Sequence, residues 1–183
     1  MLNRPDRGEY ADFYAAYISK VPDGDLLNFM ELQPGEFNGL VNDLTDEQAM
    51  QPLAHGKWSV KQVLGHLCDT ERIMGYRALR FARSDKAEIE GFEQDDYVRN
   101  GPYADLSLAA LVEEFKTIRA ATLSLLRNLR PEDWARRGTA NQKGITVRAL
   151  AYVIAGHEIH HRNVIEERYL KSDGEGKVLG RAI

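Results

Sequence analysis

The chain has 183 residues and a mass of 20.7 kDa, and its 24 basic and 28 acidic side chains give a net charge of −4. The charges are spread along the sequence without a basic block, which argues against a nucleic-acid partner, and no apolar run reaches the about 20 residues that cross a membrane. A single cysteine excludes an internal disulfide framework and fits a reducing compartment. We therefore expect a cytoplasmic protein with one domain over residues 1–183, a core over about 25–170 and a flexible tail from 171.

Apolar residues at three- and four-residue intervals predict helices in the first third of the chain. A helix is expected over residues 9–20, and a longer pattern follows over residues 25–44. Pro34 lies inside this second pattern, where a proline removes an amide donor, so we expect a kink or two shorter helices there. Residues 45–56 are expected to form a loop with a short helical turn.

The strongest helix signal begins at Ser59. Ser59 and Gln62 have the spacing of a capping box, and an apolar periodicity continues from there to Phe81. The acidic region over residues 84–105 contains two glycines and a proline, so we expect a long crossover with little helix. Its aromatic side chains are expected to cover one end of the domain or to line a pocket.

The last two long helices follow from the same periodicity. One is expected over residues 106–128, and the other begins after Thr146, which has the side chain of a helix N-cap. A polar loop is expected over residues 136–144. Four long helices, one long crossover and no strand pattern predict an all-α four-helix bundle.

Three of the five histidines lie close together near the end of the sequence. His157 and His161 are four residues apart on the predicted buried face, so one metal ion could bind both imidazoles. Leaving buried polar groups unpaired costs about 1–3 kcal/mol each, so both rings need partners. His66, beside the buried face of an earlier helix, is the natural third ligand. The alternative is a hydrogen-bonded cluster with Asp69 or Glu71.

The same segment matches the pattern His-Glu-x-x-His, in which a metalloprotease carries its general base at the glutamate. Glu158 holds that position. However, it lies one residue away from the buried face, so we expect it to point toward solvent or a neighbouring chain. The chain also ends soon afterwards and offers no strand for a peptide substrate to extend. A protease is therefore disfavoured.

Two segments together resemble a known family. Residues 57–67 (KWSVKQVLGHL) and residues 156–161 (GHEIHH) are similar to the DinB-like (YfiT-like) superfamily of metal-dependent enzymes, and the resemblance extends from about residue 25 to 170. The first segment is followed by Asp69, Glu71 and Arg72. The resemblance implies a four-helix bundle, often dimeric, in which three histidines hold a divalent ion. By motif these are His66, His157 and His161.

His160 is not carried over as a ligand, because it lies about 100° away from the buried face; we expect it near the ligands or at a dimer surface. Three imidazoles leave an open coordination position, which is typical of catalytic sites. The metal, zinc, nickel or iron, would lower the pKa of a bound water or a thiol. We therefore expect a homodimeric enzyme acting on a small molecule, either a hydrolase or a thiol S-transferase that uses a low-molecular-weight thiol.

A second hypothesis is a non-catalytic binding or stress-response module in which the metal only stabilises the bundle. In that case Asp69 or Glu71 would close the fourth coordination position. The arginines of the same helix, Arg72, Arg77 and Arg80, are interpreted as packing residues on solvated helix faces, and one of them is a possible carboxylate-binding residue.

Overall fold

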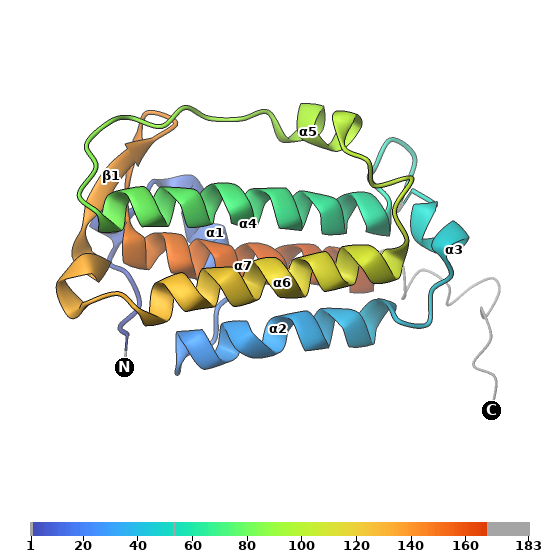
Figure 1. Ribbon diagram of the computed structural model, residues 1–183, viewed down its shortest axis with the longest axis horizontal. Helices are drawn as coiled ribbons and strands as arrows, with labels where there is room; N and C mark the ends of the chain where they lie inside the picture. Colours follow the sequence, from blue (N-terminus) through green and yellow to red (C-terminus); the bar gives the residue numbers. More distant parts are fainter. Residues whose placement is uncertain (1, 53, 168–183) are drawn as a thin grey trace.

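The computed structural model describes residues 2–52 and 54–167. Within these residues four long helices run along the long axis of the molecule (Figure 1). They are α2 (Leu26–Val41), α4 (Val60–Ala82), α6 (Leu108–Arg127) and α7 (Val147–Ile165). Because α4 and α2 each pack against both α6 and α7, the helices form a closed ring. The predicted four-helix bundle is confirmed. The predicted tail lies outside the described residues.

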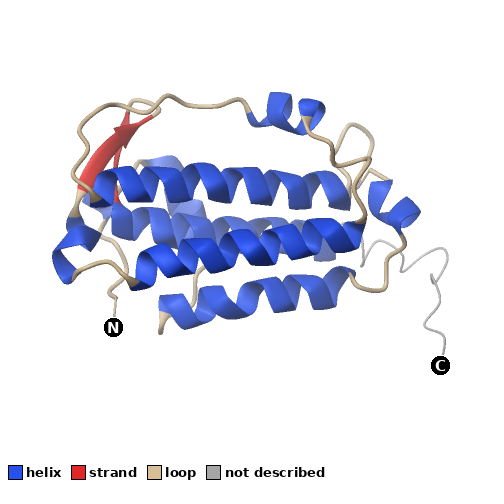
Figure 2. Cartoon of the chain, in the orientation of Figure 1, coloured by secondary structure: helices blue, strands red, loops and turns tan. Residues whose placement is uncertain are grey.

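Shorter elements cover the ends and one side of the bundle (Figure 2). They are the 3-10 turns η1 (Arg7–Glu9), η2 (Asp12–Tyr14) and η3 (Pro131–Ala135) and the helices α1 (Ala15–Ile18), α3 (Asp46–Met50) and α5 (Gln94–Asn100). The helix predicted over residues 9–20 is shorter than expected, because η2 leads directly into the single turn of α1 and helical backbone covers only residues 12–18. That turn packs against α7.

Helix α2 continues through Pro34, so the prediction of two shorter helices is wrong. A proline cannot donate the amide hydrogen bond that the carbonyl four residues earlier would accept. That carbonyl belongs to Met30, and it accepts a hydrogen bond from Nη1 of Arg119 at 2.8 Å. A buried side chain of α6 therefore satisfies the group that Pro34 leaves without its helical partner.

The predicted starts of α4 and α7 are confirmed. The amide of Gln62 donates to the Ser59 hydroxyl at 3.2 Å, and the Ser59 amide donates to the Gln62 side chain at 2.9 Å. Thr146 caps α7 by accepting from the amide of Ala149 at 3.1 Å. The crossover between α4 and α6 passes over one side of the bundle (Figure 1) and contains the short helix α5.

The predicted polar loop over residues 136–144 is wrong. Two strands, β1 (Arg137–Ala140) and β2 (Lys143–Thr146), form an antiparallel hairpin just before α7. Asn141 and Gln142 connect them with φ values of 49° and 60°. Two consecutive residues with positive φ are the feature of the tight hairpin turn that matches the twist of the strands. Asparagine tolerates this backbone conformation better than most residues, but the usual glycine is absent.

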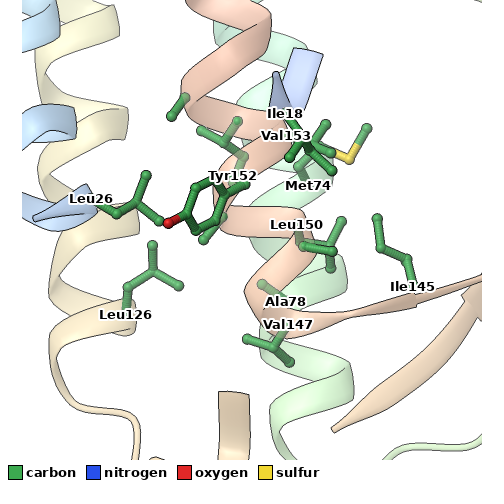
Figure 3. Packing of buried hydrophobic residues seen from close by; sticks show 14 of the residues in the cluster. Ile18, Leu26, Met74, Ala78, Leu126, Ile145, Val147, Leu150, Tyr152 and Val153 are labelled. Carbon is green, nitrogen blue, oxygen red and sulfur yellow. The ribbon is translucent and has the colours of Figure 1, made fainter. Parts of the chain in front are cut away.

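Two apolar clusters fill the bundle, one at each end. The cluster at the hairpin end is shown in Figure 3, where the labelled side chains come from α1, α2, α4, α6, β2 and α7. The second cluster includes Phe37, Leu64 and Phe115. Between the clusters, buried polar residues come from all four long helices; they include Gln33, Thr70, Glu71, Arg119, Thr122, His157 and Glu158. Polar groups in the middle of a bundle are typical of a ligand or metal site. None of the described helices has the length and apolar character of a membrane span.

Candidate metal centre

The structure brings His66, His157 and His161 together in this polar layer. Nε2 of His157 lies 3.1 Å from Nε2 of His66 on α4 and 3.1 Å from Nε2 of His161, one turn later on α7. All three ligand nitrogens lie within 4.8 Å of one another. Zinc bonds of about 2.05 Å in a tetrahedron separate two nitrogens by about 3.3 Å. The three-histidine cluster, as we call these residues, could therefore hold a metal ion.

The electrostatics of the cluster favour neutral rings. Burial lowers the pKa of His66 to about 4 and that of His161 to about 3, the latter helped by the neighbouring imidazoles. The pKa of His157, which is 8% exposed, falls well below its ordinary value for the same reasons. The hydroxyl of Thr70 lies 3.4 Å from Nδ1 of His66, so it can accept a hydrogen bond from a proton on Nδ1 in the tautomer that keeps the Nε2 lone pair free. Neutral imidazoles with free lone pairs are what a divalent ion requires.

Aromatic rings surround the cluster. The Trp58 ring lies 4.8 Å from that of His66 and stacks at 6.4 Å on that of His161. On the other side, Tyr17 of α1 presents its ring edge-on to His157 at 5.3 Å and to His160 at 5.5 Å. His160 is half-buried beside His161, so it lies near the ligands as one of the two expectations had it.

The two carboxylates that were alternatives to a metal have other partners. Asp69 accepts a hydrogen bond from the Tyr103 hydroxyl and lies 3.5 Å from a guanidinium nitrogen of Arg72. Glu71 accepts two hydrogen bonds from Arg119, at 2.8 and 2.9 Å. The hydrogen-bonded cluster of histidines with Asp69 or Glu71 is therefore wrong.

Glu158 does not point toward solvent, and that prediction is wrong. It is 1% exposed, because α2 covers the face of α7 on which it lies. The Gln33 amide donates to Oε2 of Glu158 and, at 2.9 Å, to the carbonyl of Ala155. The Gln33 amide oxygen in turn accepts from Arg119 at 2.7 Å. A continuous hydrogen-bonded chain thus links Glu71, Arg119, Gln33 and Glu158 across the bundle.

The second oxygen of Glu158 is different. Oε1 has no hydrogen-bond partner, and the closest cation in an ion pair with it is the guanidinium of Arg162, at 3.8 Å. Burial raises the pKa of Glu158 to about 7, an effect that the charges of Arg162 and Arg119 partly oppose. The carboxyl group beside His157 can therefore exchange a proton near neutral pH.

A cavity of about 330 Å³ extends from the cluster toward the hairpin end of the bundle. His66, His157 and Glu158 form part of its wall. Most of the remaining wall is aromatic or apolar and includes Phe13, Tyr14, Tyr17, Met74, Phe92 and Ile154. Of the crossover aromatics, Phe92 does line this cavity, whereas Tyr97 and Tyr103 line a separate hollow. Sequence reasoning missed the wall formed by η2 and α1, where the clustered aromatics around Tyr14 were the available signal.

Arg77 also belongs to this wall. It is 3% exposed, so its assignment to a solvated helix face is wrong. Its Nη2 donates to the carbonyl of Glu90 in the crossover at 3.0 Å. The hairpin turn closes the same end of the cavity through Asn141, whose backbone amide donates a hydrogen bond to the carbonyl of Ile89 at 2.8 Å.

Comparison with known proteins identifies the family of this chain. The family model of the DinB superfamily matches residues 30–165, a range that contains the three-histidine cluster. Two Oceanobacillus iheyensis proteins, OB0413 and OB0782, are each 25% identical to the chain, over 137 and 146 residues. The alignments cover 74% and 79% of this chain and 78% and 84% of the relatives, whose names describe candidate metal-dependent hydrolases.

A solved structure supports the fold. YfiT from Bacillus subtilis, described as a probable metal-dependent hydrolase with an unusual four-helix bundle topology, superimposes with a TM-score of 0.74. The match covers 84% of this chain and 93% of YfiT at 18% sequence identity. At that identity the likeness is evidence for the shared bundle alone.

Proposed function

The chain belongs to the DinB superfamily, and from this premise we propose that it is a metal-dependent enzyme acting on a small molecule. In this proposal His66, His157 and His161 bind one divalent ion. The observation that carries the proposal is the convergence of three imidazole nitrogens at the wall of a cavity of about 330 Å³. Nε2 of His157 lies 3.1 Å from Nε2 of His66 and from Nε2 of His161, and all three ligand atoms lie within 4.8 Å of one another. This volume is at the small end of the range for ligand pockets.

The donor set fits zinc, nickel or iron, because neutral imidazoles suit all three ions. A bound ion would supply Lewis acidity, which polarises a substrate group and lowers the pKa of a coordinated water or thiol. The chain itself would fix the geometry: Thr70 orients His66, and Trp58 and Tyr17 restrict the rings of the cluster from two sides. Glu158 would hold or release a proton at Oε1, the oxygen without a hydrogen-bond partner.

Two reaction classes follow from this chemistry, hydrolysis and thiol S-transfer with a low-molecular-weight thiol. The names of the two Oceanobacillus relatives favour hydrolysis. A homodimer is also part of the proposal. Sedimentation equilibrium would give twice the chain mass of 20.7 kDa for a dimer.

The alternative function is a binding or stress-response module that the metal only stabilises. It needs a coordination sphere closed by protein. The carboxylates expected to close it, Asp69 and Glu71, instead bind Tyr103 and Arg119. The cavity beside the cluster is a further argument for a site that admits a substrate.

Metal content tests the proposal. Elemental analysis of tag-free protein, purified without added metal, should find one ion per chain in the wild type and in His160→Ala. The ion should be lost in His66→Ala, His157→Ala and His161→Ala. His160→Ala is the matched control, since its ring is 5.0 Å from that of His161 but lies outside the ligand cluster. A wild type that binds no ion after incubation with zinc and nickel, or an equal loss in His160→Ala, would overturn the proposal.

With the metal identified, ester and amide hydrolysis and thiol transfer can be screened in the loaded protein. The His157→Ala variant should lack whichever activity the wild type has. Activity that survives in that variant would place the reaction away from the cluster.

A further inference from the structure

Two buried side-chain atoms in the described part of the chain lack a hydrogen-bond partner, Nε of Arg77 and Oε1 of Glu158. Both residues line the cavity that starts at His66 and His157. A buried polar group without a partner is destabilising, so such groups call for a specific explanation. Their occurrence in the wall of one cavity points to a ligand that supplies the missing partners.

The surroundings of Arg77 leave its charge without a counterion. Nη1 contacts the thioether of Met74 at 3.7 Å, and Nη2 donates to the carbonyl of Glu90 at 3.0 Å. Among the described residues no acidic side chain forms an ion pair with Arg77. The Tyr14 side chain hydrogen-bonds to Arg77 but does not supply a negative charge, because burial raises the pKa of its hydroxyl and keeps it neutral. A guanidinium is always charged in proteins, and a buried one normally has an anionic partner.

The acidic residues of the same cavity wall have other roles. Glu71 is held by the two hydrogen bonds from Arg119, which match its charge. Glu93 is exposed, and Glu158 adjoins the histidines and accepts a hydrogen bond from Gln33 at its other oxygen. Arg77 is thus the positive group of this wall whose charge the described residues leave unmatched.

Helix geometry places Arg77 and the histidines at opposite ends of the cavity. Arg77 follows His66 by eleven residues, which corresponds to about 16 Å along the axis of α4. The two positions differ by only about 20° around that axis, so they lie on nearly the same face of the helix. The wall between them includes Met74 on the same helix and the aromatic rings of Tyr14 and Tyr17. A ligand that spans this distance would have an apolar body with a polar group at each end.

We propose that Arg77 anchors the carboxylate of a small organic acid, whose apolar body lies along the aromatic wall and whose reactive end reaches the three-histidine cluster. This inference rests on the proposed function for the role of that reactive end. A carboxylate fits better than a phosphate, because a single guanidinium matches one negative charge. A dianion would also face the carboxyl groups of Glu93 and Glu158.

The test compares an acid with its uncharged analogue. The probes are 4-phenylbutanoate and 4-phenylbutanamide, which have the same apolar body, and ligand-observed NMR titration gives their dissociation constants. The full-length protein is measured with its metal and again after treatment with a chelator, so that binding of the carboxylate to the metal is recognised. A charge-assisted hydrogen bond contributes about 1.5–3 kcal/mol. The acid should therefore bind about 10- to 100-fold more tightly than the amide in both samples.

Two variants locate the effect. Arg77→Gln should reduce the preference for the acid to about one, whereas Arg72→Gln should retain it. Arg72 is the matched control because it lies on the same helix, pairs with Glu114 at 2.7 Å and is outside this cavity. If Arg77→Gln does not fold, Arg77→Lys keeps the charge and should retain a smaller preference.

The outcomes separate the anchor from the metal. Equal binding of acid and amide by the wild type, or an unchanged preference in folded Arg77→Gln, would overturn the anchor even if the protein carries one ion per chain. A clear preference in a protein that binds no metal would support the anchor and overturn the proposed function instead.

Discussion

Replacing Arg119 with methionine would remove the centre of the buried network. Arg119 is 1% exposed and makes two hydrogen bonds to Glu71, which is 4% exposed. The change leaves that carboxylate buried without a partner, and removing one partner of a buried ion pair costs about 3–5 kcal/mol. It also leaves the Met30 carbonyl unpaired, since Pro34 has no amide hydrogen to offer it. We expect the free energy of unfolding to fall by about 4 kcal/mol or more.

Urea unfolding monitored by circular dichroism measures this loss. The double variant Arg119→Met/Glu71→Leu should be more stable than Arg119→Met alone, because an apolar pair avoids the buried, unpaired charge. Arg127→Met is the control, since its ion pair with Glu31 is about half exposed and should contribute less than about 1 kcal/mol. Equal losses in Arg119→Met and Arg127→Met, or a double variant as unstable as the single one, would refute this account of the network.

Two further predictions concern the metal site and its support. Because burial depresses the pKa of His66 to about 4 and that of His161 to about 3, zinc affinity measured against a chromophoric chelator should change less than about threefold between about pH 7.5 and about pH 5.5. A site of three imidazoles with the ordinary pKa of 6.5 would lose zinc affinity by about a thousandfold over the same pH range. In the metal-free protein the three depressed histidine pKa values lower stability as the pH falls below about 6.5, because the unfolded histidines take up protons first. The raised pKa of Glu158 acts in the opposite direction, but three histidines outweigh one carboxyl group, so a net rise in stability on acidification would contradict the histidine shifts. Separately, Gly156→Ala should lower the free energy of unfolding, measured in urea, by about 1–3 kcal/mol, because the added Cβ would lie 2.1 Å from the Tyr17 carbonyl oxygen. Gly75→Ala is the control and should be neutral or stabilising, since the nearest contact of its Cβ is at 3.7 Å. Similar losses in both variants would show that the contact with α1 is not the cause.

Local signals were sufficient to predict the long helices. Ser59 with Gln62 and Thr146 mark helix starts through their side-chain oxygens, and apolar periodicity defines the length of each helix. The errors occurred where a distant group satisfies a local requirement. Helix α2 passes through Pro34 because Arg119, 85 residues later, donates to the carbonyl that the proline leaves unpaired. No local pattern around Pro34 contains that information.

The same distinction separates the histidines from Glu158. His157 and His161 are predictable as a pair because their spacing alone brings them to one face of a helix. The orientation of Glu158 depends on which faces of α7 are covered, and α7 packs against α1, α2 and α4. Every residue from 149 to 159 is buried, so this helix has no solvated face in that stretch. The small and apolar residues before Gly156 were the available signal, since a helix that is apolar all round is buried.

The two buried arginines of the site then show which unsatisfied groups are meaningful. The fold provides Arg119 with Glu71, the Gln33 oxygen and the Met30 carbonyl, so a buried guanidinium in this bundle can be fully paired. Arg77 is buried to a similar extent, but its partners are one carbonyl, a thioether and the neutral Tyr14 side chain, none of which carries a negative charge. Its Nε has no partner and belongs to a residue of the cavity wall. Because the same packing satisfies one arginine and not the other, the deficit at Arg77 is specific to the cavity. That contrast is why we assign the missing partner of Arg77 to a ligand and not to imperfect packing.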